Sequence, residues 1–511
     1  MLAKIKSSAV IGVDALPVTV EVDISFGLPS FSTVGLAEGA VRESRERVKA
    51  AIKNSGYDFP SRRITVNLAP ADLKKEGAGY DLPMALGILT ASEILKSEKL
   101  DDYGVIGELS LDGSIRPARG ILPMAITAQR AGLEGILVPH DNAEEAAVVE
   151  GIKIIGVKTL YEAVEFLIGT RKLTPTAVNL HSIFQNNASY AVDFDEVKGQ
   201  EHVKRAMEIA AAGGHNILMK GPPGSGKTML ARRLPTILPD LTFEEALETT
   251  KIYSVMGMLK NNTPLLAARP FRAPHHTISD VGLIGGGQTP KPGEVSLAHN
   301  GVLFLDESPE FKKNVLEVLR QPLEDGMVTI SRATGSLSFP ARFILVIAFN
   351  PCPCGYLGDM HHDCRCTPAQ VQRYESKLSG PLLDRIDMHL EVPSMPYKKM
   401  ASGTNGESSY LIKERVEQSR VLQKKRFARH KNFYCNGQMT PNDLKKFCSL
   451  DKASEKLIAD AVERLGLSTR SYHRVLKIGR TIADLDKNGS LQAKHVAEAI
   501  QYRRLDRTNR C

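Results

Sequence analysis

The sequence predicts an α/β protein of several domains. Short apolar runs such as Ile64–Leu68 and Val302–Leu305 alternate with helix-like stretches such as Ala40–Asn54, as expected where strands alternate with crossover helices. At 511 residues the chain is too long for one hydrophobic core, so two to four domains are expected. Three apolar runs end directly in polar motifs, which is typical of a parallel sheet that presents its carboxyl ends to a ligand.

Changes in composition divide the chain into five stretches. Residues 1–170 form a first α/β region, and a polar, proline-containing linker follows at 171–192. Residues 193–395 carry the three strands that end in motifs, 396–410 belongs to a second linker, and 411–511 is helical and basic. The chemistry therefore concentrates in the third stretch.

Composition and charge restrict the location and the partners. Apolar residues make up 42% of the chain and charged residues 24%, the longest apolar runs are short of a membrane span, and no secretory signal follows Met1. We therefore expect a cytoplasmic protein that does not enter the membrane. Of the overall charge of +8, Leu411–Cys511 alone holds +12, from 23 Lys and Arg against 11 Asp and Glu, which leaves −4 elsewhere. A basic terminal domain favours DNA as a partner, and the alternative is a solvated, lysine-rich helical surface.

The segment that follows the strand Asn216–Met219 fits the phosphate-binding pattern G-x-x-x-x-G-K-[ST]. It consists of Gly221, Pro222, Pro223, Gly224, Ser225, Gly226, Lys227 and Thr228, with a helix expected from about Met229. The glycines let successive N–H groups point at phosphate, Lys227 reaches the β and γ oxygens, and the Thr228 hydroxyl ligates Mg²⁺. ATP and Mg²⁺ are therefore the expected ligands.

Two further strands end in residues suited to ATP hydrolysis. The strand Val302–Leu305 runs into Asp306 and Glu307, of which Asp306 can hold the Mg²⁺ shell while Glu307 polarises the attacking water. The third strand, Ile344–Ala348, is followed by Asn350, whose amide is suited to orient that water. Together with the phosphate-binding loop, these residues predict an ATP-hydrolysing site at one edge of a sheet.

Two arginines are candidates for neutralising the charge of the γ-phosphate. Arg385 lies among acidic neighbours and would act as a finger on an adjacent subunit, whereas Arg470, within a helical pattern, would act as a sensor in a lid. The alternative for each is a surface arginine in a salt bridge.

The ordered set of these motifs resembles an AAA+ ATPase of the magnesium-chelatase and MCM-related branch. Three phrases, Arg-Ala-Pro-His-His-Thr from Arg272, Gly-Gly-Gly-Gln-Thr-Pro-Lys-Pro-Gly-Glu from Gly285 and Asn-Pro-Cys-Pro-Cys-Gly from Asn350, are similar to the YifB/ComM family of Mg chelatase-like proteins. The similarity covers nearly the whole chain. It implies an AAA+ P-loop NTPase core, a C-terminal helical lid, a homo-hexameric ring and a helicase that extends DNA branches in recombination or natural transformation. It also implies that Arg385 is the finger and that Arg470 is the sensor-2 arginine, with Arg474 as the alternative.

Residues 1–170 resemble a Lon-type protease domain with the ribosomal S5 domain 2-like fold. The phrase Lys75–Asp81 stands at the place of the Lon nucleophile loop, and Gly107–Gly113 copies a following strand and turn. Gly79 occupies the position of the nucleophilic serine and Leu122 that of the lysine, so a Ser-Lys dyad cannot form. We interpret this domain as a structural or interaction module without peptidase activity.

Four of the seven cysteines form a cluster with metal-ligand spacing. Cys352 and Cys354 are separated by nine residues from Cys364 and Cys366, and a loop of that length can close a tetrahedral Cys₄ site for structural Zn²⁺. Two alternatives stay open: His361 or His362 replaces one cysteine, or the loop is reduced and metal-free.

Two segments are candidate DNA-contacting loops. Met327–Arg332 and Ser336–Phe339 have the pattern of a hairpin, which the resemblance places in the pore of the ring, where Arg332 would meet phosphate. Gly285–Gly293, with Lys291, is expected to be a second pore loop; both could instead be plain subunit contacts. We therefore expect a ring-forming DNA translocase or branch-migration helicase. The alternative is a protein-remodelling or metal-chelatase-like motor subunit without DNA activity.

Overall fold

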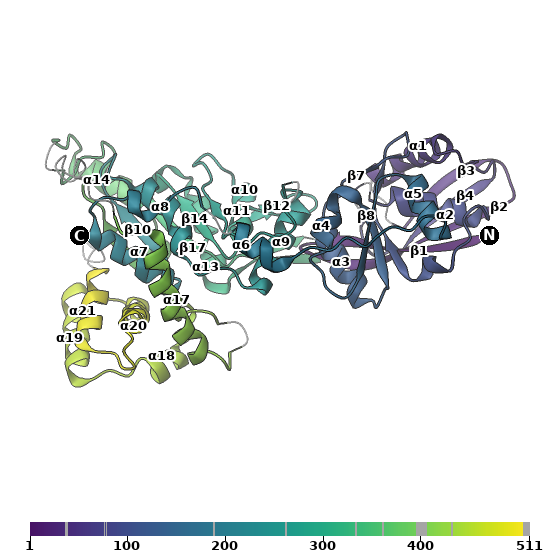
Figure 1. Ribbon diagram of the computed structural model, residues 1–511. Coiled ribbons are helices and arrows are strands. Elements are labelled where there is room, and N and C mark those ends of the chain that lie inside the picture. Colours follow the sequence, from purple (N-terminus) through teal and green to yellow (C-terminus); the bar gives the residue numbers. More distant parts are fainter. Residues whose placement is uncertain are drawn as a thin grey trace. The chain divides into compact units, whose positions relative to one another are not determined.

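The computed structural model describes residues 1–35, 39–75, 77, 79–187, 190–260, 263–332, 335–359, 362–394, 406–430 and 433–503. The chain divides into two compact units, Met1–Asn187 with Thr242–Ala267, and Ala188–Leu241 with Ala268–Cys511 (Figure 1). The segment Thr242–Ala267 thus belongs with the first unit, although it lies within the sequence range 193–395 that carries the motifs. Most of the second linker, with its expected range 396–410, lies outside the described residues.

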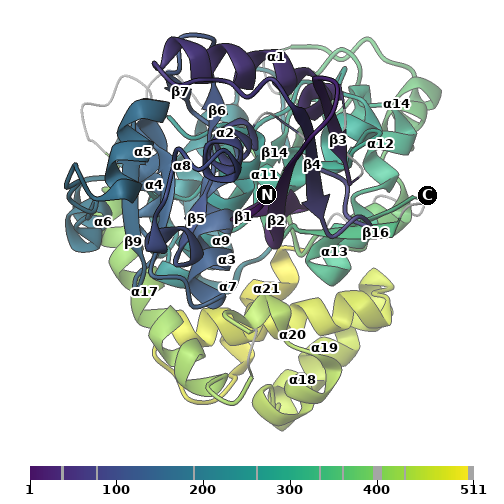
Figure 2. The same ribbon diagram turned by 90° about the vertical axis from the view of Figure 1, so that its right-hand side faces the viewer.

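A mixed seven-stranded sheet forms the centre of the first unit, in the order β3-β4-β2-β1-β5-β8-β9 (Figure 2). β2 pairs antiparallel with β1 and β4, and the other neighbours in this sheet run parallel. Its strands, with the small hairpin β6–β7, are β1 (Leu2–Ile11), β2 (Asp14–Ser25), β3 (Ser30–Val34), β4 (Arg63–Ala69), β5 (Tyr103–Val105), β6 (Glu108–Leu109), β7 (Ile115–Arg116), β8 (Gly135–Pro139) and β9 (Lys153–Val157).

The helices of the first unit cover this sheet. They are α1 (Gly39–Asn54), α2 (Asp81–Ala91), α3 (Ile121–Arg130), α4 (Ala143–Ala146), α5 (Leu160–Ile168), α6 (Leu180–Asn187) and α9 (Phe243–Met256). Ten of the eleven residues of α2 are buried, since this helix is apolar on every side and packs against β1 and β2. Helix α6 lies inside the predicted linker 171–192, and α9 comes from the chain between the motif-bearing strands.

The second unit contains a five-stranded sheet in the order β11-β14-β17-β10-β18, and all its pairs are parallel. The strands are β10 (Ile217–Lys220), β11 (Phe271–Arg272), β14 (Val302–Leu305), β17 (Ile344–Phe349) and β18 (Met388–Glu391). Every residue of β14 and β17 is buried, because helices cover both faces of such a sheet. The residues that follow β10, β14 and β17 therefore meet at one edge.

Helices and two short hairpins surround this sheet. They are α7 (Glu201–Gly213), α8 (Lys227–Ile237), α10 (Asp280–Ile284), β12 (Gly285–Gly286), β13 (Lys291–Pro292), α11 (Glu294–Leu297), α12 (Lys313–Glu317), α13 (Arg320–Asp325), β15 (Met327–Arg332), β16 (Gly335–Pro340), α14 (Pro368–Glu375) and α15 (Gly380–Leu383). The pairing of β15 with β16 confirms the hairpin expected from the sequence.

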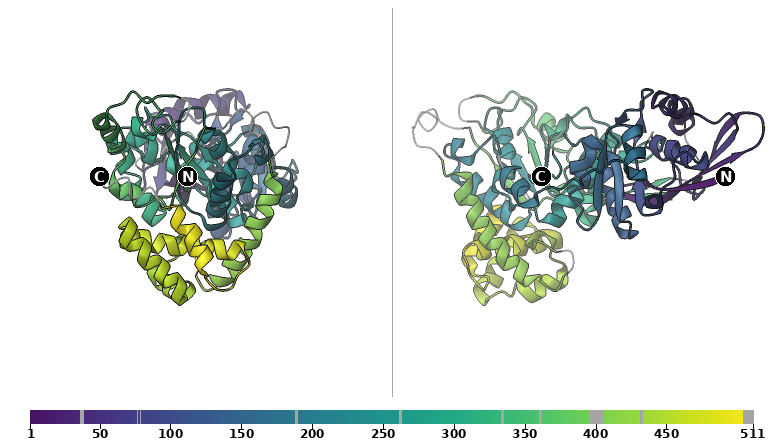
Figure 3. Two further views of the ribbon diagram at one scale, coloured as in Figure 1. Left: turned by 90° about the vertical axis from the view of Figure 1, so that its left-hand side faces the viewer. Right: turned by 45° about the vertical axis from the view of Figure 1, so that its right-hand side comes forward.

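The C-terminal region is helical, as its sequence indicates (Figure 3). It consists of α17 (Ser409–Arg426), α18 (Pro441–Phe447), α19 (Lys452–Leu465), α20 (Thr469–Leu485) and α21 (Ala493–Gln501). Val475 and Ile482 of α20 share one buried cluster with Ile217 of β10, so these helices and the sheet have a common core. Within the described part of the chain, no helix combines the length and apolar character needed to cross a membrane.

Candidate active site

The phosphate-binding loop connects β10 to α8. Gly224 and Gly226 have φ of +73° and +90°, a region that strains any residue with a side chain. Gly221 is constrained by space, because a Cβ there would lie 2.1 Å from the carbonyl oxygen of Val392. Helix α8 begins at Lys227, two residues earlier than expected, so its first N–H groups point into the loop.

The ammonium group of Lys227 is surrounded by oxygen acceptors. It donates to the carbonyls of Gly221 (2.7 Å) and Pro222 (2.8 Å) and to Oδ1 of Asn350 (3.2 Å). Burial lowers the pKa of Lys227, and the nearby charge of Asp306 acts in the opposite direction. Two residues predicted from separate strands, Lys227 and Asn350, are therefore in direct contact.

The carboxylates after β14 meet the start of α8. The Thr228 hydroxyl donates to Oδ2 of Asp306 at 2.6 Å, so the two predicted Mg²⁺ ligands are adjacent. Glu307 adopts left-handed backbone with φ of +49°, its amide donates to Oδ1 of Asp306 at 3.0 Å, and its side chain is 60% exposed. A non-glycine residue held in this region is strained, which is a feature of functional sites. Nδ1 of His276 lies 3.7 Å from Oε2 of Glu307.

Asn350 forms hydrogen bonds through its backbone as well as its side chain. Its amide N–H donates to the hydroxyl of Tyr374 on α14, and burial raises the pKa of that phenol to about 12. Tyr374 therefore stays protonated at neutral pH. The next residue of α14, Glu375, pairs with Lys220 at the end of β10 at 2.6 Å.

Arg385 and Arg470 converge on one carboxylate, Glu324 of α13. Nη2 of Arg385 lies 2.5 Å from Oε1 of Glu324, and Nη2 of Arg470 lies 4.0 Å from the same oxygen. Arg385 is 12% exposed, whereas Arg470 is 59% exposed. Nδ2 of Asn216, which precedes β10, donates to the carbonyl of Arg385. Arg385 therefore lies at the amino-end edge of the parallel sheet, across the four residues of β10, or about 13 Å, from the phosphate-binding loop.

Arg474, the alternative sensor-2 arginine, forms a salt bridge away from the phosphate-binding loop. Its guanidinium contacts Oδ1 of Asp387 at 2.6 Å, and the other oxygen of Asp387 accepts from the amide of Asn216 at 2.9 Å. Burial alone would raise the pKa of Asp387, but Arg474 and His215 outweigh it and hold that pKa well below its usual range. This buried pair joins α20 to the sheet.

Comparisons with known proteins identify the family of this chain. Models of the magnesium chelatase subunit ChlI match residues 193–400 and 20–142, and a model of its C-terminal part matches 406–503. Competence protein ComM of Haemophilus influenzae is 44% identical over 99% of this chain and 98% of its own length. The chain belongs to the YifB/ComM family. YifB of Escherichia coli, a protein without an assigned function, is 44% identical with the same coverage, and Rv2897c of Mycobacterium tuberculosis is 41% identical over 98% of both chains. The chain is therefore a magnesium-chelatase-like AAA+ ATPase.

This YifB/ComM chain brings its four clustered cysteines together. Sγ of Cys352 lies 3.3 Å from that of Cys354 and 3.7 Å from that of Cys364, and all four sulfurs, including that of Cys366, lie within 4.8 Å of one another. A disulfide needs about 2.05 Å, whereas the sulfurs of a tetrahedral Zn²⁺ site, with Zn–S of about 2.3 Å, lie about 3.8 Å apart. The spacing fits a metal site.

The surroundings of the cysteines act on the individual thiols in different directions. Amides of Tyr356 and Arg365 donate to Sγ of Cys354 and lower its pKa to about 6. The amide of Cys354 lowers the pKa of Cys366, but desolvation and the neighbouring sulfurs outweigh it and raise that pKa to about 12. Thiolates this close repel one another unless a cation lies between them. Of the two histidines considered as ligands, His362 pairs instead with Asp359, and His361 lies outside the described residues.

The two predicted DNA-contacting residues lie on separate hairpins. Arg332 is exposed at the end of β15, opposite Gly335, and the turn residues 333–334 lie outside the described residues. Lys291 is exposed on β13, opposite Gly286. Each is a cation at or next to the connection of its hairpin, available to a ligand.

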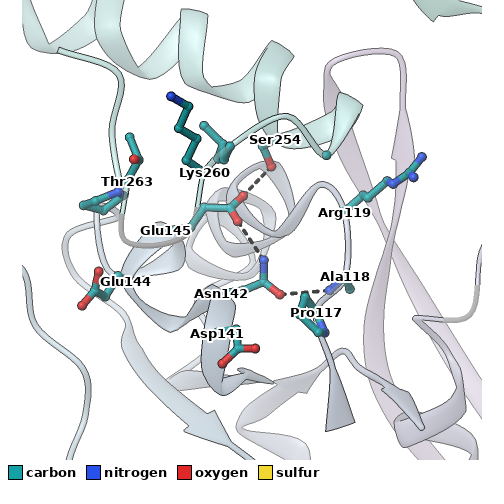
Figure 4. A pocket seen from close by; sticks show the side chains of 13 residues that line it. Pro117, Ala118, Arg119, Asp141, Asn142, Glu144, Glu145, Ser254, Lys260 and Thr263 are labelled. Carbon is teal, nitrogen blue, oxygen red and sulfur yellow. Dashed lines mark hydrogen bonds between the residues drawn. The ribbon is translucent and has the colours of Figure 1, made fainter. Parts of the chain in front are cut away.

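The first unit has a polar cavity of about 260 Å³ between α4 and the end of α9 (Figure 4). Its buried carboxylate, Glu145, accepts hydrogen bonds from the Ser254 hydroxyl, the Asn142 amide group and the backbone of Leu122. Burial raises the pKa of Glu145. Since these donors occupy the carboxylate, we interpret it as the anchor of α9 on this unit. Leu122 contributes only its backbone here, and Gly79 does not line the cavity.

Sequence reasoning missed three residues of the site. Tyr374, Glu324 and His276 each act on a predicted residue that is distant along the chain. His276 lies in the phrase from Arg272 that carried the family resemblance. That phrase indicated the family but assigned no role to His276. Glu324 and Tyr374 have no motif of their own, and only the fold places them.

Proposed function

We propose that this chain is the subunit of a homo-hexameric ring that hydrolyses Mg-ATP and moves along DNA as a branch-migration helicase in recombination or natural transformation. The observation that carries the proposal is the meeting of Lys227, Thr228, Asp306, Glu307 and Asn350 at one edge of the sheet. The family relationship to ComM, named a competence protein, supports the biological setting. The free cysteines suit the reducing cytoplasm.

Each residue of the cluster has a role that its position supports. Lys227 would exchange its carbonyl partners for the β and γ oxygens of ATP, and the adjacent Thr228 and Asp306 would hold Mg²⁺, which neutralises phosphate charge during transfer. The exposed carboxylate of Glu307 would accept a proton from the attacking water, with Asn350 as the second group that orients it. His276 is placed to restrain Glu307 until substrate arrives.

The arginine pair would complete the site of a neighbouring subunit. Arg385 lies across the sheet from its own phosphate-binding loop, and Arg470 lies beside the same carboxylate. A group at that edge can serve a nucleotide only across a subunit boundary, so we assign both arginines to the neighbour's γ-phosphate. Glu324 would keep them oriented before contact.

The DNA contacts are assigned to Arg332, Lys291 and the basic region Leu411–Cys511. The two hairpin cations are exposed. The β12–β13 strands carry no aromatic residue, and Phe339 of β16 is fully buried, whereas an exposed aromatic plug would favour a polypeptide in the pore. The first unit is proposed to be a Lon-like domain without peptidase activity, because Gly79 and Leu122 replace the dyad. The cysteine cluster is proposed to hold structural Zn²⁺.

The test is ATP hydrolysis and DNA binding by the same protein. Hydrolysis should rise with single-stranded, forked or branched DNA, and binding by the Glu307→Gln variant with ATP should weaken steeply as salt rises. Arg332→Ala should lower the salt slope by roughly one unit per lost contact and weaken binding to all sequences alike. Lys96→Ala, which removes an exposed cation from the first unit, serves as the control.

No DNA binding at low salt with nucleotide present, together with ATP hydrolysis that ignores DNA, would contradict the helicase. The protein-remodelling motor would then replace it.

A further inference from the structure

We propose that the four-cysteine cluster, once loaded with Zn²⁺, is a brace that holds the ATP site in its hydrolysing geometry, so that metal content controls turnover. The inference rests on the proposed ATPase function and goes beyond a structural metal, because it connects the cluster to named atoms of the nucleotide site. Two chain segments run from the cysteines into that site, and the metal would tie them together.

The first segment reaches the site through Asn350. Only Pro351 separates Asn350 from the fully buried Cys352, and Oδ1 of Asn350 accepts from Lys227 at 3.2 Å. A movement of Cys352 would therefore displace the amide that contacts the phosphate-binding lysine.

The same segment also packs on the phosphate-binding loop itself. Gly355 has φ of +88°, and a Cβ at this position would lie 2.7 Å from Cδ and Cγ of Pro223 and 3.9 Å from Cγ of Asn350. The backbone next to Cys354 is thus in contact with the loop that cradles phosphate, and only glycine allows so close an approach.

The second segment returns to the site through α14. Cys366 is followed by Thr367, which caps α14 with a reciprocal pair of hydrogen bonds to Gln370. The far end of this helix supplies Tyr374, which accepts from the backbone of Asn350, and Glu375, which pairs with Lys220 at the end of β10. Both segments therefore reach Asn350, the first through the chain itself and the second through Tyr374.

The cysteine sulfurs bring the two segments together at this loop, where the rings of Tyr356 and His362 also stack. Cys352 and Cys354 belong to the first segment, Cys364 and Cys366 to the second, and the sulfurs of Cys354 and Cys364 lie 3.6 Å apart without a bond. Four thiolates on one Zn²⁺ would fix this junction, and outer groups that fix an active residue are worth about 10- to 100-fold in activity. Without the metal, no bond holds the two segments together at the cysteines.

Two glycine variants separate the effect of metal loss on ATP hydrolysis from the effect of packing against the phosphate-binding loop. Gly355→Ala keeps all four thiols but pushes against Pro223, whereas Gly358→Ala, at a similar φ of +78°, meets nothing within 4 Å. We expect about one zinc per chain in wild type and in both variants. Hydrolysis should fall at least about tenfold in Gly355→Ala and stay within about twofold of wild type in Gly358→Ala.

Metal removal gives the complementary readout. Cys366→Ser, or wild type stripped by a chelator, should lose zinc and lose hydrolysis to a similar extent, and returning Zn²⁺ to the stripped protein should restore turnover. The affinity for a fluorescent ATP analogue is measured for every protein. A displaced phosphate-binding loop therefore lowers a measured affinity even where no turnover occurs.

A chain purified without metal that hydrolyses ATP normally, a stripped chain that keeps its turnover, or equal behaviour of the two glycine variants would overturn the brace. If wild type with full zinc binds the analogue but never hydrolyses ATP, the proposed function fails instead. The analogue's affinity for the two glycine variants then decides the brace separately.

Discussion

At the scale of single residues, the ATP site depends on a few contacts that carry separate tasks. Lys227 is the cation at the phosphate-binding loop and Glu307 is the exposed carboxylate beyond β14. The spacing of the motif made Lys227 and Thr228 predictable, because the chemistry requires those residue types at those offsets. Asp306 was predictable from its place at the end of a buried strand. Tyr374 and Glu324 could not be predicted, since their role comes from proximity in space and not from a pattern along the chain.

The separation of tasks predicts two different variants. Lys227→Ala should abolish ATP binding, because the cation aimed at the β and γ oxygens is gone. Glu307→Gln should bind ATP with nearly wild-type affinity and lose turnover by about 10²- to 10⁴-fold, as expected when proton acceptance is removed. Equilibrium binding of a labelled nucleotide and steady-state hydrolysis measure both effects. Equal nucleotide affinity in the two variants would contradict these roles.

At the scale of elements, the sequence predicted where the strands lie better than which helix side chains are exposed or paired. Runs of buried apolar residues identified β14 and β17 because a parallel sheet excludes polar side chains on both faces. Arg470 and Arg474 lie one turn apart on α20 and look equivalent in sequence. The structure leaves Arg470 exposed and pairs Arg474 with Asp387, a difference that depends on the packing of α20 against the sheet.

The Asp387–Arg474 pair predicts a stability effect with a defined pH dependence. Asp387→Asn should destabilise the second unit by about 3 kcal/mol, because it leaves the Arg474 charge buried without its partner. Since the pKa of Asp387 is lowered in the folded state, its contribution is fully present above the unfolded value of about 3.9 and is lost as the pH falls through the lower folded value. Thermal unfolding should therefore separate the variant from wild type at pH 5 to 8, and the gap should narrow only in stronger acid. Asp460→Asn on the exposed side of α19 is the control, and an equal loss in both variants would contradict the account.

At the scale of the whole molecule, the sequence predicted the order of the regions, but the two units do not follow that order without interruption. The motifs predicted an ATPase core between two other regions, and the C-terminal helices share that core as their apolar spacing suggests. The assignment of Thr242–Ala267 to the first unit had no sequence signal. The contacts of this segment include Glu145 of α4 with Ser254 of α9, 109 positions apart, and Lys251 with Asp14.

The central claim is that the ATP site is completed across a subunit boundary by Arg385. The most direct test mixes two inactive proteins, Glu307→Gln and Arg385→Ala, and measures ATP hydrolysis in the co-assembled rings. Alone, Arg385→Ala should hydrolyse ATP about 10³- to 10⁵-fold more slowly than wild type, and Glu307→Gln about 10²- to 10⁴-fold more slowly. In the mixture, an intact Glu307 from one subunit meets an intact Arg385 from the next, so turnover should recover at a fraction of the sites. Mixed rings that bind ATP but recover no hydrolysis at any ratio would contradict the account.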